Sequence, residues 1–266
     1  MGNNIDEYLR KFGDIGQLNR LVLLNEMDKI WSDFNLDNKK PQRSQHDAIG
    51  KFYSHPVWIL NGIFSELDDV SKKHRVAIAE HIRNLTPNRV ADYGGGSGVL
   101  ARCISTVAPA LVDIIEPYPS QYFLDRLKNF SNINLVPVLV PEYDIVVAQD
   151  VLEHVDDPVG LAVELISATK MNGHLIFANC FYPDIKCHLP SAFYLRHTFS
   201  TLMTYAGLKF IEYINGAEHA LVFKRIGPIM NKELYTANKR AKVFGSLLNL
   251  IHGIGGQVKR KLKVIL

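Results

Sequence analysis

A short apolar run that ends in closely spaced glycines dominates the middle of the chain. Residues 89–100 contain Gly94, Gly95, Gly96 and Gly98 directly after Val-Ala-Asp-Tyr. Glycine adopts positive φ without steric cost and lets the backbone approach a ligand closely. A helix that begins after such a turn directs unpaired N–H groups towards it. The pattern therefore predicts a strand, a ligand-binding turn and a helix.

A single carboxylate follows the next apolar run. Glu116 comes directly after Leu111–Ile115, where strand–turn–helix–strand nucleotide sites place an acid on the ribose hydroxyls. In dinucleotide sites the third glycine of the motif comes three residues after the second, whereas here it comes two residues after. We therefore predict a nucleoside-binding site, with a nucleotide-binding oxidoreductase kept as an alternative.

Composition limits the class of protein. At 266 residues, with 47% hydrophobic and 21% charged residues, the chain suits one large α/β domain with accessory parts. No apolar run approaches the ~20 residues of a membrane helix, and the first residues lack the layout of a signal peptide. Three cysteines provide no disulfide framework. These features favour a cytoplasmic protein.

Positive charge is concentrated at the C-terminus. Residues 231–266 hold eight Lys and Arg residues and one Glu, a net charge of +7 against +3 for the whole chain, so the remainder carries −4. An acidic body argues against nucleic acid as the substrate. The basic segment suits a solvated extension or a helix packed on a partner subunit, and alternatively a weak contact with an anionic membrane surface.

The chain divides into three predicted parts. Residues 1–86 show helical spacing of apolar side chains throughout and form a predicted helical cap. Residues 87–226 alternate between strands and helices and form the predicted catalytic domain, and residues 227–266 are a basic extension with a helix over 234–251. The predicted strands cover residues 89–93, 111–115, 133–138, 143–149, 173–179, 208–214 and 219–224.

The order of these elements predicts a parallel sheet with helices on both faces. Predicted helices cover about 98–107, 119–129, 158–170 and 198–206, and Asp157 and Pro158 suit the N-cap and first position of the third. Asn215-Gly216 between the last two strands predicts a tight hairpin, so that the final pair is antiparallel.

Five stretches together give the chain its resemblance to a known family. They are Ala91-Asp-Tyr-Gly-Gly-Gly-Ser-Gly98, Glu116, Tyr143-Asp-Ile-Val-Val-Ala-Gln-Asp-Val-Leu-Glu-His-Val155, Met171-Asn-Gly-His-Leu-Ile-Phe177 and Arg196-His-Thr-Phe199. Over residues 89–224 the chain resembles the class I S-adenosylmethionine-dependent methyltransferases that modify small molecules. The resemblance implies a seven-stranded Rossmann-like sheet with one antiparallel strand, and S-adenosylmethionine as cofactor with S-adenosylhomocysteine as product.

The resemblance also implies a cofactor site. The glycine turn would hold the amino acid portion, Glu116 the ribose, and Pro117 the adenine, while Gln149 and Asp150 would lie beside the methionine part. The implied cofactor-binding residues are Asp92, Tyr93, Gly94, Gly95, Gly96, Glu116, Pro117, Gln149 and Asp150. Similar enzymes hold the adenine amino group with an acid between the third and fourth strands. Here residues 135–141 contain none, so we expect adenine on backbone groups near 137–139.

Four residues are candidates for the catalytic base. His188, Tyr194 and His197 belong to a long segment after the fifth predicted strand, and loops at that edge of a sheet commonly cover active sites. His154 follows the fourth strand. Asn179 is followed by Cys180 rather than by a second ligand of the catechol methyltransferase kind, so we expect no metal site.

These observations predict methyl transfer to a small-molecule or sugar-like acceptor. Oxygen is favoured over nitrogen or carbon because histidine and tyrosine, which suit removal of a hydroxyl proton, are placed in the covering segment. A non-catalytic module that binds S-adenosylmethionine is the second alternative. The acceptor and the oligomeric state stay open.

Overall fold

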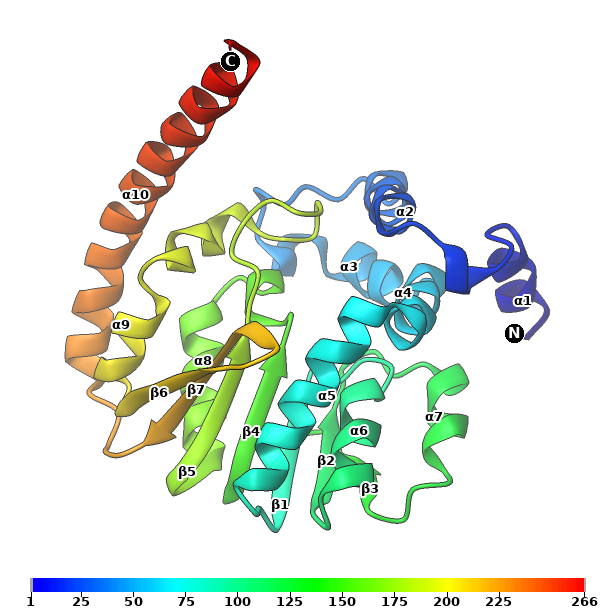
Figure 1. Cartoon of the computed structure of the whole chain (residues 1–266), viewed down its shortest axis with the longest axis horizontal. Helices are drawn as coiled ribbons and strands as arrows, with labels where there is room; N and C mark the ends of the chain where they lie inside the picture. The colour runs from blue at the N-terminus through cyan, green and yellow to red at the C-terminus, as the bar shows by residue number, and fades with distance from the viewer. Residues whose placement is uncertain (1, 266) are drawn as a thin grey trace.

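Seven strands form one sheet at the centre of the chain, in the order β3-β2-β1-β4-β5-β7-β6 (Figure 1). The computed structural model describes the backbone of residues 2–265 and the side chains of residues 5–251. The strands are β1 (Arg89–Tyr93), β2 (Leu111–Ile115), β3 (Ile133–Leu135), β4 (Tyr143–Gln149), β5 (Thr169–Ala178), β6 (Leu208–Ile214) and β7 (Ala217–Arg225). Strand β7 runs antiparallel to both of its neighbours, and the other paired strands are parallel. The predicted Rossmann-like sheet with one antiparallel strand is confirmed.

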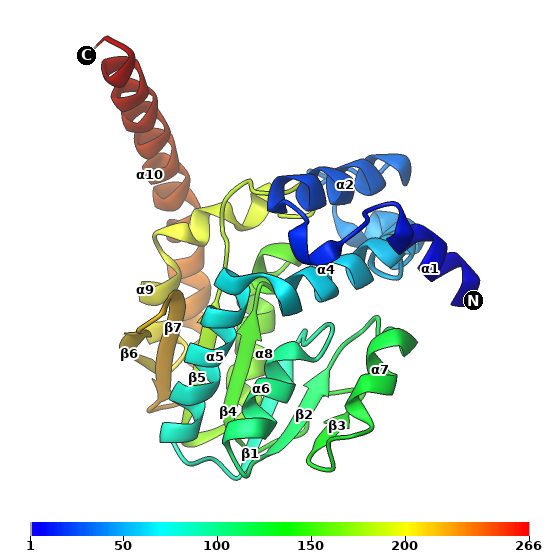
Figure 2. The ribbon, with the colours of Figure 1, turned by 45° about the vertical axis from the view of Figure 1, so that its right-hand side comes forward.

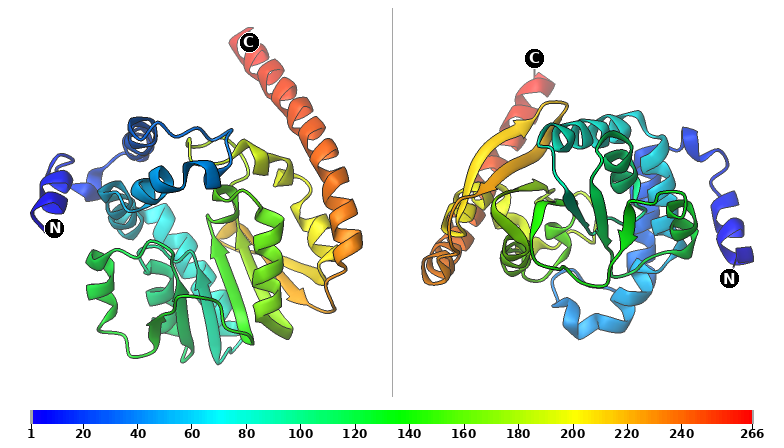
Figure 3. Two further views of the ribbon diagram at one scale, coloured as in Figure 1. Left: turned by 180° about the vertical axis from the view of Figure 1, so that it is seen from behind. Right: turned by 90° about the horizontal axis from the view of Figure 1, so that it is seen from below.

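Helices cover both faces of the sheet (Figures 1 and 3). One face carries α5 (Asp69–Asn84) and α6 (Val99–Val107), whose buried aliphatic residues share a core with β1, β2 and β7. The other face carries α8 (Pro158–Ala168), α9 (Phe199–Tyr205) and the start of α10 (Asn231–Ile265). Helix α7 (Gln121–Leu127) lies beside β3. Both faces of β1 and β4 are buried over Val90–Asp92 and Ile145–Ala148, as is usual for parallel strands covered by helices on both sides.

The N-terminal helices lie across the carboxyl ends of the parallel strands (Figure 2). They comprise α1 (Gly2–Arg10), η1 (Ile15–Gln17), α2 (Arg20–Asp33), η2 (Gln42–Gln45), α3 (His46–Tyr53) and α4 (Pro56–Leu67). They have a core of their own, in which Trp31 and Phe52 pack edge to face. Cys187, from the segment that follows β5, is buried in that same core.

Local sequence signals set several element ends. The Asp157 side chain accepts a hydrogen bond from the Gly160 N–H at the start of α8, and Pro158 occupies its first turn, as predicted. Gly216 has a φ of 85° in the turn between β6 and β7, which are antiparallel as the Asn-Gly pair predicted. Such a turn needs a residue that tolerates positive φ.

Three predicted boundaries are wrong. Strand β3 ends at Leu135 rather than at residue 138, because Pro137 has no N–H to donate to a neighbouring strand. Helix α8 ends at Ala168, so β5 begins at Thr169 and the predicted start at residue 173 is too late. Helix α10 runs from Asn231 to Ile265 and does not stop at residue 251, since single glycines cost a helix only about 1 kcal/mol each.

Along the part of the chain that the structure describes, no helix combines the length and the apolarity needed to cross a bilayer.

Candidate active site at the carboxyl edge of the sheet

The glycine turn after β1 is linked to Glu116 at the end of β2. The Gly96 N–H donates to Oε2 of Glu116 and the Tyr118 N–H donates to its Oε1, both over 2.9 Å. Burial raises the pKa of Glu116, and the two N–H donors partly oppose that rise. The carboxylate that the sequence assigned to a ribose thus lies directly at the glycine turn.

Gly94 is required in this turn for two reasons. Its φ is 67°, and a Cβ atom at this position would lie 2.5 Å from Cγ2 of Val151. Val151 follows β4, so the absence of a side chain at Gly94 lets the first and fourth strands bring their ends together. Gly96, also at positive φ, has only the Gly94 carbonyl within 4 Å of such a Cβ and faces open space.

Asp92 lies behind the glycine turn. It is buried, and a Cβ on Gly95 would lie 2.9 Å from its Oδ2. Burial raises its pKa to about 7, against the lowering effect of Arg75 and of the Ala101 N–H. The contact of Asp92 with the cofactor stays a prediction, and its Oδ2 atom is buried without a hydrogen-bond partner.

The other predicted cofactor residues lie at the same edge. Pro117 is exposed beside Glu116, and Gln149 is half-buried at the end of β4. Asp150 has a φ of 53° and donates its N–H to the Ala178 carbonyl over 2.7 Å, which turns its side chain out to solvent. Tyr93 is half-buried below the turn.

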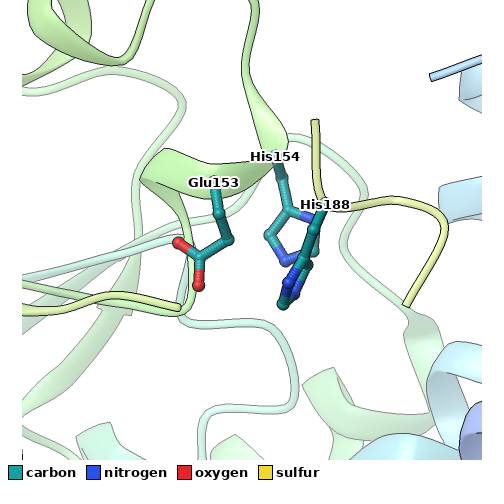
Figure 4. Close-up of side chains that lie close together, drawn as sticks. All are labelled: Glu153, His154 and His188. Carbon is teal, nitrogen blue, oxygen red and sulfur yellow. The ribbon is translucent and has the colours of Figure 1, made fainter. Parts of the chain in front are cut away.

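Next to the end of β4, three titratable side chains form a cluster (Figure 4). Glu153 and His154 come from η3 (Leu152–His154), and His188 comes from the segment after β5. One ligand atom of each lies within 4.8 Å of the others, and the two imidazole centroids are 4.8 Å apart. The fold thus brings His154 and His188, predicted separately, to one place.

Hydrogen bonds define the tautomers of both histidines. Nδ1 of His154 lies 3.1 Å from the Cys187 carbonyl, and Nδ1 of His188 lies 2.9 Å from the Tyr182 carbonyl. A carbonyl oxygen only accepts, so both Nδ1 atoms donate and both neutral rings keep an unprotonated Nε2. Two acceptor nitrogens therefore belong to the cluster.

Burial sets the protonation of this cluster. It lowers the pKa of His154 to about 3, with His188 adding to the effect. Burial also lowers the pKa of His188, while the charges of Asp150 and Asp184 act in the opposite direction. Burial, reinforced by Asp150, raises the pKa of Glu153 to about 8. Near neutral pH the histidines are neutral bases and Glu153 is largely protonated.

Contacts with the N-terminal helices hold the cluster in place. Gln42 of η2 donates through Nε2 to the His154 carbonyl over 2.6 Å. The Lys186 N–H donates to Asp28 of α2 over 2.6 Å, and Arg20 pairs with Asp184. The segment that carries His188 is therefore fastened to α2.

Aromatic rings and unpaired polar atoms lie near the histidine cluster. Tyr53 stacks on Tyr118 with centroids 5.3 Å apart, and both Tyr53 and Trp58 meet the His154 ring edge to face. Several buried polar atoms in this part of the structure have no hydrogen-bond partner: Tyr53 Oη, Trp58 Nε1, Glu153 Oε2 and both side-chain atoms of Asn179. Since buried polar groups are normally paired, this donor and acceptor set fits a polar nucleoside and its acceptor.

Comparison with known proteins identifies the family. A family described as a methyltransferase domain matches residues 68–213, more than half of the chain. The chain belongs to this methyltransferase family. Its cofactor is S-adenosylmethionine, and the oxidoreductase alternative has no support from the match.

Two curated relatives of this methyltransferase carry the same name, ubiquinone biosynthesis O-methyltransferase. The protein from Pectobacterium carotovorum subsp. carotovorum is 26% identical over 156 residues, covering 54% of this chain and 65% of the relative. The protein from Escherichia fergusonii is 27% identical over 146 residues, covering 50% of this chain and 60% of the relative. The chain thus spans less than two thirds of these relatives.

A solved structure supports the fold. An O-methyltransferase family protein from Burkholderia thailandensis matches with a TM-score of 0.54 at 13% identity, over 78% of this chain and 70% of that chain. At this identity the likeness shows the methyltransferase fold alone.

Two predicted catalytic residues lie away from the methyltransferase cleft. Tyr194 is buried in η4 (Pro190–Arg196), and its hydroxyl donates to Oδ1 of Asn238 in α10 over 2.6 Å. His197 lines a groove of about 490 Å³ between α9 and α10. Neither joins His154 and His188, because residues 190–205 turn away from the sheet edge to pack beneath α10.

His55, in the N-terminal helices near this edge of the sheet, has a structural role. Its Nδ1 accepts a hydrogen bond from the Val57 N–H at the start of α4, and its ring contacts Tyr8 and Phe34. Tyr53 and Trp58 contact His154, whereas His55 caps a helix.

Sequence reasoning did not place Glu153 in the site. In the sequence, Glu153 lies between the apolar residues Val151-Leu152 and Val155, and this setting was the available signal. In the fold Glu153 is buried, and a buried carboxyl group often marks a functional site. Among the described residues, Glu153, His154 and His188 are also the set that could hold a metal ion. The expected absence of a metal stays a prediction.

Proposed function

We propose that this chain transfers the methyl group of S-adenosylmethionine to a hydroxyl oxygen of a small-molecule or sugar-like acceptor. The observation that carries the proposal is the pair of Nε2 acceptor atoms on His154 and His188, buried at the sheet edge next to Glu153. A hydroxyl must lose its proton when it attacks, and a positioned base contributes about 10²–10⁴-fold to the rate. The name of the curated relatives, O-methyltransferases, agrees with an oxygen acceptor.

The geometry of the turn supports the proposed cofactor residues. Glu116 would exchange its two N–H partners for the ribose hydroxyls, and the backbone of Tyr93 to Gly96 would bind the amino acid portion. Pro117 and the Tyr118 ring would flank adenine. Gln149 and Asp150 would lie beside the methionine part at the end of β4.

When bound, S-adenosylmethionine supplies an electrophilic methyl group. The chain's own residues orient the acceptor, exclude water and receive the proton. The N-terminal helices and the segment 179–189 close the cleft, and alignment in such a site contributes up to roughly 7–11 kcal/mol.

His188 is the better base of the two. The Tyr182 carbonyl and the negative charges of Asp150 and Asp184 favour its protonated form against the opposing charge of Arg20, and so stabilise the imidazolium that forms when the ring takes the hydroxyl proton. His154 has no such partner, and its low pKa makes it a weak base. We assign His154 to orienting the acceptor through Nε2.

The roles of the three predicted parts of the chain also belong to this proposal. Within the predicted cap of residues 1–86, helices α1–α4 would cover the acceptor, whereas α5 packs on the sheet of the predicted catalytic domain, residues 87–226. Residues 227–266 would form an extension whose first turns pack on that domain. The separate apolar core of the cap, and its hydrogen bonds to the turn that carries His154, support this reading.

Two measurements in series test the proposal. Calorimetry with S-adenosylhomocysteine should give saturable binding, and tritium from labelled S-adenosylmethionine should then pass to one or more members of a panel of phenols, catechols and sugars. Nuclear magnetic resonance of the product assigns the methylated atom, and turnover should persist in excess chelator.

Three outcomes would overturn parts of the proposal. Cofactor binding without transfer to the panel or to fractionated cell extract would favour a non-catalytic binding module. A methylated nitrogen or carbon would reject the hydroxyl acceptor. Loss of turnover in chelator, restored by a divalent cation, would indicate that the cluster binds a metal ion and does not act as a base.

A further inference from the structure

Helix α10 has one face packed on the protein and another that is open. On the packed face, Leu234 and Ala241 are buried against α9 and η4, and Nδ2 of Asn249 donates to the Phe193 carbonyl over 2.8 Å. At Gly245 the helix backbone runs so close to Tyr194 that a Cβ would overlap the Tyr194 carbonyl. The helix is therefore firmly seated along residues 234–249.

The open face is apolar. Val243 is 69% exposed, Phe244 60% and Leu250 61%, and Leu247 and Ile251 are also more than half exposed. These positions follow the spacing i, i+1, i+4, i+7 and i+8, which places them on one side of a helix. Isolated exposed apolar residues are ordinary, but a contiguous row marks a binding surface. Figure 1 shows α10 running along one edge of the molecule.

Positive charge adjoins this row. Lys239, Arg240 and Lys242 lie in the turns before it, and the whole segment 231–266 has a net charge of +7. The groove between α9 and α10 is lined by Lys232 and Arg240 with the apolar Phe244, and Glu233 is the acidic residue in its lining. Anionic groups would pair with the cations while the apolar row enters a hydrophobic layer.

We propose that the exposed face of α10 docks on an anionic lipid bilayer. Basic residues beside an apolar helix face are the features by which helices lie in the headgroup region of such membranes. A second copy of the chain is a poorer occupant, since pairing two α10 helices would bring together two segments of +7. The proposal depends on this face alone and is independent of methyl transfer.

Vesicle co-sedimentation tests the proposal with the full chain. We expect binding to phosphatidylcholine vesicles that contain phosphatidylglycerol and little binding to phosphatidylcholine alone. A V243Q/L247Q/L250Q variant should bind about tenfold more weakly, and a K239E/K242E variant should lose most of its preference for the anionic vesicles. High salt should weaken binding of the parent chain.

A matched control removes exposed apolar residues elsewhere. V70Q/I211Q alters α5 and β6 and should bind vesicles like the parent chain. Circular dichroism and S-adenosylhomocysteine affinity should be unchanged in all variants, which shows that each is folded. Equal sedimentation of the parent and the V243Q/L247Q/L250Q variant would overturn the proposal. So would a dimer in solution that the same variant dissociates while vesicle binding is absent.

Discussion

The glycine turn and the histidine cluster lie at the same edge of the sheet but are built from different lengths of chain. The turn joins residues 93–98 to Glu116 through one strand–helix–strand unit, with main-chain N–H groups as its donors. The cluster joins η3, the segment after β5 and the N-terminal helices, and the hydrogen bonds between these segments span 112 and 158 residues of sequence. The first region is a local property of the backbone, whereas the second exists only when distant segments pack.

This difference separates two functions. A backbone turn recognises what every member of the family binds, so its geometry tolerates little change. Side chains supplied from the N-terminal helices and a loop can differ without disturbing the sheet, and we propose that the acceptor is recognised there. Variants in the two regions should therefore affect different measurements.

The largest effect is expected from His188→Gln. Loss of the Nε2 base should lower kcat for the identified acceptor by about 10²–10⁴-fold, while calorimetry with S-adenosylhomocysteine gives the parent affinity. His46→Gln, on an exposed histidine of α3, is the matched control and should keep full turnover. A kcat for His188→Gln equal to the parent value would remove His188 as the base.

Glu116→Gln should affect cofactor binding at the glycine turn. A neutral amide loses charge-assisted hydrogen bonds worth about 1.5–3 kcal/mol, so the affinity for S-adenosylhomocysteine should fall roughly 10–100-fold. Glu218→Gln is a suitable control, because Glu218 accepts a comparable main-chain hydrogen bond from Gly216 in a distant turn. Unchanged affinity in Glu116→Gln would reject the ribose assignment.

Gly94→Ala tests whether the turn tolerates a side chain. Backbone strain of about 1–3 kcal/mol and overlap with Val151 should lower both the melting temperature and cofactor affinity, the latter by about tenfold. Gly13 has nearly the same φ, 62°, but no atom within 4 Å of a Cβ. Gly13→Ala should therefore lose stability alone, and a loss of cofactor affinity in it would contradict a specific role for Gly94.

The pKa of Glu153 predicts how stability depends on pH. Because the folded state raises this pKa from its ordinary 4.5 to about 8, it binds a proton that the unfolded state releases between those values. Stability should therefore fall as pH rises from about 4.5 to 8 and then level off. Glu153→Gln should not show this component, so the difference in melting temperature between the two proteins should change across that range. A constant difference would mean that Glu153 is ionised in the fold.

The smallest effect is expected from Tyr194→Phe. It removes the hydrogen bond to Asn238 and should cost about 0.5–1.5 kcal/mol in the free energy of unfolding, with kcat unchanged. Asn238→Ala should cost a similar amount, and the double variant should be less than additive because both remove one interaction. A large loss of kcat in Tyr194→Phe would indicate that Tyr194 takes part in catalysis.

The sequence alone predicted the sheet, its antiparallel strand and the linkage of the glycine turn to Glu116. Each of these depends on apolar period, turn residues or short spacing, which are properties of adjacent residues. The clearest errors, at Leu135 and Ala168, are boundaries where a proline or the register of a neighbouring strand decided the end.

The tertiary structure alone decided which polar residues meet. His188 and His197 belong to the same predicted segment, yet one joins His154 and the other faces α10, because residues 190–205 fold back beneath that helix. The packing of surrounding segments also places Glu153 in the cluster and buries Asp92 behind the glycines. Burial and pairing depend on what distant segments cover, and the order of residues along a chain does not specify that directly.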